Sequence, residues 1–215
     1  MHAATREMFD EAGAMRIADG AWLLRGFALE REAALLAAIE SVVAQAPFRR
    51  METRRGLRMS VAMSNCGEVG WVSDRRGYRY TARDPLDGAP WPAMPTALAS
   101  LATDAAHAAG HACFAPDACL VNRYVPGTRL SLHQDRDERD FDAPIVSVSL
   151  GLPATFLFGG PERSDRTQRI GLRHGDVVVW GGASRLFHHG VAPLADGTHP
   201  LLGAQRINLT FRKAL

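Results

Sequence analysis

The second half of the chain is a series of short strand-like segments, and this pattern limits the fold more than any other feature. After Pro116, apolar segments alternate with Gly and Pro turns, in the order ACLVNRY, IVSVSLG, ATFLFGG, QRIGLR, DVVVWGG, RLFHHGV and RINLTFR. Short, closely spaced strands are typical of an antiparallel sandwich or jelly roll. The pattern therefore predicts a mainly β fold of the α+β class with a jelly-roll core.

The N-terminal half is expected to contribute two helices that support this core. Apolar residues recur at helical spacing between Leu29 and Pro47, where the proline ends the pattern. A second helix is expected with Pro95 in its first turn and Gly110 at its C-terminal cap. At 215 residues the chain fits one domain. We expect helical support over about 1–47, a flap over about 48–92 and the β core over about 93–215.

Composition argues against a membrane or secreted protein. The hydrophobic fraction of 47% and charged fraction of 22% are ordinary for a soluble globular chain, and no stretch approaches the roughly 20 apolar residues of a membrane span. The N-terminus lacks the basic-then-apolar layout of a secretory signal. Cys66, Cys113 and Cys119 lack metal-finger spacing and favour a reducing compartment. We expect a cytoplasmic monomer that does not bind membranes.

The flap carries a local excess of positive charge. Between Arg49 and Arg83, nine arginines face three acidic residues, a surplus of six charges that attracts polyanions. Trp71, Tyr78 and Tyr80 lie inside the same segment. Aromatic rings stack on exposed bases and arginines bind phosphates, which favours nucleic acid as the partner. The alternative is that these rings only pack the flap onto the core.

The segment SLHQDRDERD contains a candidate pair of metal ligands. His133 and Asp135 are two residues apart, so in an extended segment their side chains face the same side. A third ligand is available from His188 or His189 in RLFHHGV. Two histidines and one carboxylate bind Fe(II) and leave three coordination positions open. The same ligands could hold zinc in a hydrolase, and a solvated charged loop is the common alternative for an isolated H-x-D pattern.

The last strand provides independent support for an iron site. In QRINLTFRKAL, one face of the predicted strand carries Arg206, Asn208, Thr210 and Arg212. Arg206 and Arg212 are about 20 Å apart along a strand, and their long side chains could close on a small dianion such as 2-oxoglutarate. Asn122 and Tyr124 could add hydrogen bonds from a neighbouring strand. The alternative is an amphipathic edge strand with a solvated face.

Several long motifs in the same order resemble the bacterial AlkB family of Fe(II)- and 2-oxoglutarate-dependent nucleic-acid dealkylases. They are PDACLVNRYVPGTRLSLHQDRDE, APIVSVSLGLPATFLFGG, HGDVVVWGGASRLFHHGV and RINLTFR, with APFRRM, MSVAMSNCGEVGW and PWPAMP upstream. The resemblance covers nearly the whole chain. It implies a double-stranded β-helix core, with the flap serving as a nucleotide-recognition lid.

The resemblance also implies a role for individual residues. It assigns the iron ligands to His133, Asp135 and His189, the last because the family's ligand directly precedes glycine, and it places Arg212 in the catalytic group. It assigns 2-oxoglutarate binding to Asn122, Tyr124, Arg206, Asn208 and Arg212, and substrate binding to Trp71, Tyr78, Tyr80, Asp137 and Arg163. Arg136, Glu138, Arg139 and Asp140 are expected to form a charged rim.

The implied reaction is oxidative demethylation of 1-methyladenine and 3-methylcytosine in single- or double-stranded DNA, with RNA as a further substrate. Fe(II) is the cofactor, 2-oxoglutarate and O2 are co-substrates, and formaldehyde, succinate and CO2 are released in this direct reversal of damage. The alternatives are an oxygenase acting on RNA, protein or a small metabolite, a zinc hydrolase, and a non-catalytic metal- or ligand-binding β-barrel.

Overall fold

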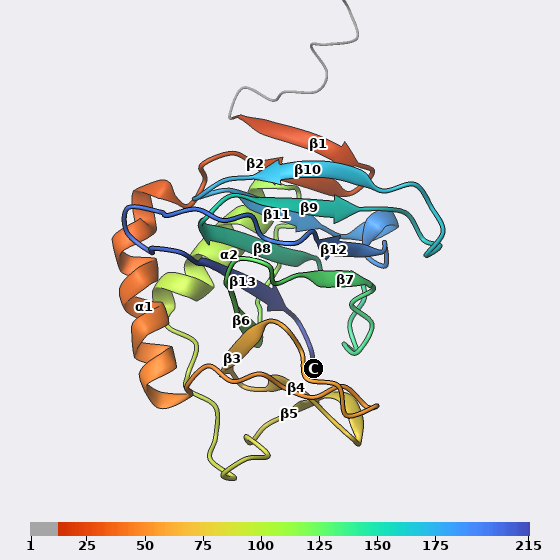
Figure 1. Ribbon diagram of the computed structural model, residues 1–215. Helices are drawn as coiled ribbons and strands as arrows, with labels where there is room; N and C mark the ends of the chain where they lie inside the picture. The colour runs from red at the N-terminus through yellow and green to blue at the C-terminus, as the bar shows by residue number, and fades with distance from the viewer. Residues whose placement is uncertain (1–12) are drawn as a thin grey trace, which may run out of the picture.

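Two antiparallel β-sheets form the core of the computed structural model, which describes residues 13–215 (Figure 1). The seven-stranded major sheet runs in the order β1 (Ala14–Ala18), β2 (Ala21–Leu24), β11 (Val177–Trp180), β8 (Ile145–Gly151), β13 (Arg206–Arg212), β6 (Ala118–Tyr124) and β3 (Ala62–Gly67). The four-stranded minor sheet runs in the order β10 (Gln168–Leu172), β9 (Ala154–Phe158), β12 (His189–Val191) and β7 (Leu130–His133). The predicted jelly-roll class is confirmed.

Both predicted helices are present and pack on the outer face of the major sheet (Figure 1). A 3-10 turn, η1 (Leu29–Arg31), leads into α1 (Glu32–Gln45), and α2 spans Thr96–Ala108. Pro95 is the N-cap residue of α2, not a member of its first turn. Gly110 follows the end of α2 with φ of 88°, a conformation that favours glycine. No helix in the described part of the chain is long and apolar enough to cross a membrane.

The N-terminal region differs from the helical support that the sequence predicted. Before α1, strands β1 and β2 form a hairpin, and β2 pairs with β11 to extend the major sheet. Each strand has only four or five residues, which is too short for its alternating pattern to stand out from the sequence. Residues 1–12 of the predicted region lie outside the described residues.

The flap is built around a small hairpin beside the core. Strand β4 (Gly70–Asp74) pairs with β5 (Gly77–Thr81) in a two-stranded sheet, and β3 joins this segment to the edge of the major sheet. Figure 1 shows the hairpin lying below the end of β13 and close to the C-terminus. The segment between the two helices therefore contains three strands, β3, β4 and β5.

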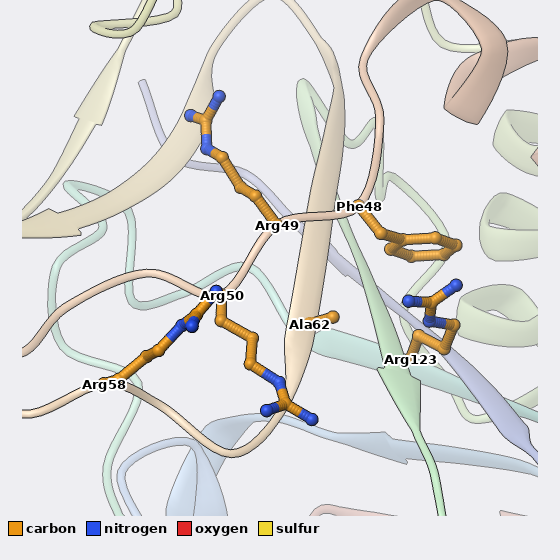
Figure 2. Close-up of a pocket in the computed structure, with 6 residues that line it drawn as sticks. All are labelled: Phe48, Arg49, Arg50, Arg58, Ala62 and Arg123. Carbon is orange, nitrogen blue, oxygen red and sulfur yellow. The ribbon is translucent and has the colours of Figure 1, made fainter.

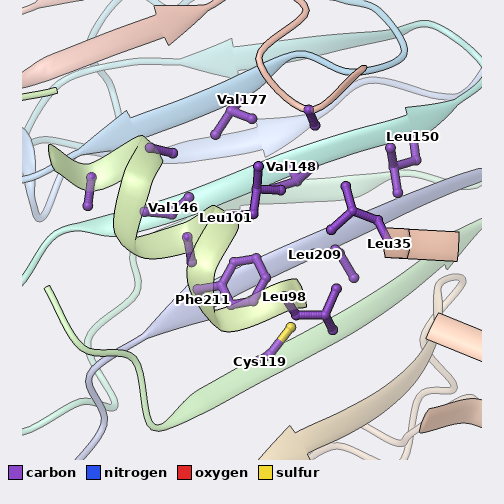
Figure 3. Packing of buried hydrophobic residues seen from close by; sticks show 14 of the residues in the cluster. Leu35, Leu98, Leu101, Cys119, Val146, Val148, Leu150, Val177, Leu209 and Phe211 are labelled. Atoms are coloured by element: carbon purple, nitrogen blue, oxygen red, sulfur yellow. The ribbon is translucent and has the colours of Figure 1, made fainter. Parts of the chain in front are cut away.

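The main hydrophobic core fills the space between the helices and the major sheet (Figure 3). Its members include Leu35, Leu98, Leu101, Cys119, Val146, Val148, Leu209 and Phe211. Strand β13 sends its apolar residues into this core and keeps its polar residues on the other face, yet all seven of its residues are buried. Because β6 and β8 flank it on both sides, β13 is a central strand, and the edge-strand alternative is wrong.

The C-terminal residues are fixed to the end of the sheet by one buried carboxylate. Asp117 is 3% exposed and accepts hydrogen bonds from Lys213 Nζ at 2.8 Å, Ala214 N at 2.6 Å and Leu215 N at 3.1 Å. These bonds hold the chain directly after β13, the strand that carries the polar face of the core.

We expect Asp117→Ala to lower the free energy of unfolding by about 3 kcal/mol, because it leaves buried backbone donors without an acceptor. Urea denaturation monitored by circular dichroism measures this loss. Asp142→Ala is the matched control, since the Asp142 side chain is exposed, and it should change stability by less than about 0.5 kcal/mol. Equal stability of the two variants would contradict an anchoring role for Asp117.

Candidate active site

Two histidines and an aspartate converge at one end of the minor sheet. His133 ends β7 and lies directly opposite His189 of β12. Asp135 follows two residues later, with Oδ1 3.5 Å from His133 Nε2 and Oδ2 3.8 Å from His189 Nε2. One donor atom from each residue lies within 4.8 Å of the others. This arrangement can hold a metal ion on one face and leave the other face open.

Hydrogen bonds to the backbone orient both imidazole rings. His133 Nδ1 lies 2.9 Å from the carbonyl oxygen of Ser131, and His189 Nδ1 lies 3.0 Å from that of Phe187. A carbonyl can only accept, so Nδ1 carries the proton and the Nε2 lone pair faces the cluster. Burial and the neighbouring His133 lower the pKa of His189 to about 3, so this ring is neutral and able to bind a metal at neutral pH.

Of the two adjacent histidines, the structure brings only His189 to the cluster. His188 precedes β12, and its ring nitrogens are not part of the group of donor atoms formed by His133, Asp135 and His189. His189 is 5% exposed and also packs against Trp180, with ring centroids 4.9 Å apart. This arrangement fits the choice of His189 made from its position before Gly190.

A buried arginine holds the carboxylate of Asp135. Arg212 donates to Asp135 Oδ2 through Nε at 2.9 Å and Nη2 at 2.7 Å. Burial alone would raise the pKa of Asp135, but Arg212 and the two histidines hold it well below its usual range. Burial alone would lower the pKa of Arg212, whereas Asp135 raises it. Asp135 therefore remains an anionic acceptor.

Glu138 belongs to this buried network, so its predicted place in the charged rim is wrong. It is 6% exposed, its Oε1 lies 3.3 Å from Arg212 Nε, and its Oε2 lies 3.2 Å from Arg185 Nη2. Arg185 also donates to the backbone carbonyl of Asp135 at 2.8 Å. The two guanidinium groups compensate for burial of the glutamate. No spacing rule links Arg185 to Glu138, so sequence reasoning missed Arg185 and placed Glu138 in solvent.

Four of the predicted 2-oxoglutarate residues are neighbours on β6 and β13. The register pairs Arg206 with Tyr124 and Asn208 with Asn122 across the two strands. All four residues are buried. The Arg206 guanidinium carbon lies 5.0 Å from the Tyr124 ring centroid. Arg212, the fifth predicted residue, contacts Asp135 and Glu138.

The surroundings of Arg206 fit a small carboxylate. Arg206 is 1% exposed and donates from Nη2 to Ser149 Oγ at 2.8 Å. Within residues 13–215, its Nε and Nη1 have no hydrogen-bond partner, and neither has the hydroxyl of Tyr124. Buried guanidinium N–H groups without an acceptor are costly, because they have lost their hydration. An anionic ligand would satisfy these donors, so the residues present fit 2-oxoglutarate.

The predicted substrate residues lie in three places. The rings of Trp71 and Tyr78 stack with centroids 5.5 Å apart, and Trp71 Nε1 donates to Asp137 Oδ2 at 2.8 Å. Tyr80 instead donates its hydroxyl to Glu138 Oε1 at 2.6 Å, so it joins the buried network and agrees with the packing alternative. Arg163 is exposed and donates to the carbonyl oxygen of Leu132 at 2.7 Å, next to His133.

Known proteins share both the sequence and the fold of this chain. Residues 20–212 match the model of the 2OG-Fe(II) oxygenase superfamily. The chain is 60% identical to an alpha-ketoglutarate-dependent dioxygenase AlkB of Salmonella typhimurium and 57% identical to one of Escherichia coli, each over 92% of both chains. The solved structure of OsALKBH1 superposes with a TM-score of 0.81 at 30% identity, covering 93% of this chain and 99% of that one.

The similarity to these proteins extends over the whole described core and not only over the histidine–aspartate cluster. The matched region begins before β2 and ends at Arg212, so it includes the three clustered residues and the Arg206 surroundings. The zinc hydrolase and the non-catalytic barrel are therefore excluded as descriptions of this protein. The chain belongs to the AlkB family of Fe(II)- and 2-oxoglutarate-dependent dioxygenases.

Proposed function

We propose that this enzyme reverses base damage by demethylating 1-methyladenine and 3-methylcytosine in single- or double-stranded DNA, with RNA as a further substrate. The products are the restored base, formaldehyde, succinate and CO2. One observation supports the proposal most strongly: β13 carries both Arg212, which binds Asp135 of the histidine–aspartate cluster, and Arg206, which has unpartnered donors, and stacked aromatic rings of the flap lie at Asp137.

The proposed roles of the buried residues follow from their contacts. His133, Asp135 and His189 hold Fe(II), which, with 2-oxoglutarate and O2, supplies the oxidation of the methyl carbon. Arg206 and Tyr124 donate to a carboxylate of 2-oxoglutarate, and Asn122 and Asn208 line the same face. Arg212 keeps Asp135 ionised and in position.

The proposed substrate site lies where the flap meets the loop after β7. A methylated base has to leave its stack to reach a metal inside a protein. The Trp71 and Tyr78 rings provide a stacking surface, and Asp137 opposes the positive charge of 1-methyladenine or 3-methylcytosine. Arg163 is an exposed cation beside the histidine cluster. We assign Tyr80 to holding the flap, because its hydroxyl is used by Glu138.

The flap favours nucleic acid over a protein or small metabolite. The surplus of six positive charges between Arg49 and Arg83 is larger than a small anionic metabolite requires. Two of these arginines are neutralised, Arg49 by Asp84 and Arg79 by Asp74, and the segment remains basic. We also propose that the enzyme acts as a monomer, with the single-domain organisation given above.

Formaldehyde release from a methylated single-stranded oligonucleotide tests the proposed reaction. We expect release from 1-methyladenine and 3-methylcytosine only when Fe(II), 2-oxoglutarate and O2 are all present. A fluorimetric assay for formaldehyde, combined with mass measurement of the oligonucleotide, follows both products. Succinate formation without any change in the oligonucleotide would show an oxygenase with a different substrate.

The two neighbouring histidines provide a matched test of the metal ligands. We expect His189→Ala to abolish Fe(II) binding and turnover, because it removes one of three donor atoms from the cluster. His188→Ala should retain both, since His188 is outside the cluster. Titration with Fe(II) under anaerobic conditions measures the binding directly. Loss of the metal in His188→Ala with retention in His189→Ala would reverse the assignment.

Replacement of Trp71 separates base binding from co-substrate turnover. We expect Trp71→Ala to raise the KM for a methylated oligonucleotide by about tenfold or more, since base stacking contributes about 1–3 kcal/mol. Its 2-oxoglutarate turnover without substrate should be unchanged. Trp71→Phe is the control that keeps a ring but loses the hydrogen bond to Asp137. An equal loss of both activities in Trp71→Ala would mean that the side chain is structural.

A further inference from the structure

A basic cavity lies where the flap begins, beside the end of α1. It has a volume of about 360 Å³ and is lined by Phe48, Arg49, Arg50, Arg58, Ala62 and Arg123 (Figure 2). We call it the outer arginine cleft. A water molecule takes about 30 Å³ in the liquid, so the cleft has room for a group as large as a sugar–phosphate unit.

The outer arginine cleft and the histidine–aspartate cluster are on opposite faces of the major sheet. Ala62 of β3 pairs with Arg123 of β6, and both line the cleft. The next pair along the same strands is Met63 and Asn122, and Asn122 is on the Arg206 face. Since successive strand residues face opposite sides, the cleft cannot be part of the 2-oxoglutarate site.

Three of the four arginines in the cleft have no acidic partner among the described residues. Arg49 binds Asp84, with Nη2 2.7 Å from Oδ1, and Figure 2 shows its side chain turned away from the others. Within residues 13–215, Arg50, Arg58 and Arg123 form no ion pair. Like charges repel one another, so a cleft of unpaired guanidinium groups favours an anion.

Arg123 is held in place without losing its charge. Its guanidinium carbon lies 4.8 Å from the centre of the Phe48 ring, and the two side chains lie one against the other in Figure 2. A cation over an aromatic face is stabilised and keeps its edge hydrogen-bond donors free. Arg50 and Arg58 are exposed and belong to the flap segment that precedes β3. The cleft therefore combines one cation packed on an aromatic ring with two exposed ones.

We propose that the outer arginine cleft binds the sugar–phosphate backbone of the nucleic acid, several nucleotides away from the damaged base. This inference deepens the proposed function and rests on it. Guanidinium groups bind phosphates in a bidentate manner, and Arg123 covers the face of the Phe48 ring to which its guanidinium is bound. β3 is an edge strand, so a bound strand can pass around it from the flap to the cleft. The cleft adds affinity for long substrates and no base specificity.

The test compares long and short substrates in a double variant, Arg50→Gln with Arg58→Gln. We expect its KM to rise about tenfold for a methylated oligonucleotide of about 20 nucleotides and to stay unchanged for a methylated trinucleotide. The kcat should not change, because neither residue contacts the metal cluster. The slope of log binding constant against log salt should become shallower by about 0.7 for each lost phosphate contact on a single strand.

Arg169→Gln with Arg173→Gln is the matched control. Both residues are exposed and carry the same charge, and they lie on or next to β10, which Figure 1 shows at the opposite end of the molecule from β3. The control should leave KM and the salt dependence at their original values. Equal behaviour of the two double variants toward the long oligonucleotide would overturn the proposal.

A second measurement separates this proposal from the proposed demethylation. Binding of an unmodified single-stranded oligonucleotide, followed by fluorescence anisotropy, requires no chemistry. Weaker binding by the Arg50, Arg58 double variant than by the control supports the cleft even if no methylated base is repaired. Unchanged binding with intact demethylation overturns the cleft and leaves the proposed function standing.

Discussion

The buried ion pair between Arg212 and Asp135 connects the two sheets at the site of the chemistry. Arg212 belongs to β13 of the major sheet, and Asp135 follows β7 of the minor sheet. The two hydrogen bonds, at 2.9 and 2.7 Å, fix the only carboxylate of the histidine–aspartate cluster. Removing one partner of such a pair leaves an uncompensated buried charge, which costs about 3–5 kcal/mol. The geometry of the cluster therefore depends on a residue that is not itself a candidate ligand.

This dependence explains why the position of β13 matters. The strand lies between β6 and β8, so its polar face is enclosed between the sheets and not exposed to water. Its apolar residues pack against the helices, which holds Arg206 and Arg212 on the opposite face. The same packing gives the two arginines different surroundings. Arg212 is neutralised by Asp135, whereas Arg206 keeps donors available for a ligand carboxylate.

Local patterns in the sequence were sufficient to predict two members of the cluster and the polar face of the strand that supports it, whereas the choice of His189 over His188 came from the family resemblance. His133 and Asp135 are related by a two-residue spacing, and the same periodicity puts Arg206 and Asn208 on one face. Glu138 could not be predicted in this way, because its burial depends on Arg185 and Arg212, which are distant in the chain. A charged residue that lies among other charged residues in the sequence is expected to be exposed to solvent. It is buried where residues distant in the chain compensate for its charge.

The same limit applies to the flap. The sequence showed that aromatic residues occur among arginines, but not that Trp71 and Tyr80 use different carboxylates. Trp71 binds the exposed Asp137, whereas Tyr80 reaches Glu138, which also contacts Arg212. Burial raises the pKa of Tyr80 well above its ordinary value, so the hydroxyl stays a donor. A hydrogen bond to a charged group contributes about 1.5–3 kcal/mol, so lifting β5 disturbs the network that holds Asp135. The position of the flap and the geometry of the metal cluster are thus coupled through one glutamate.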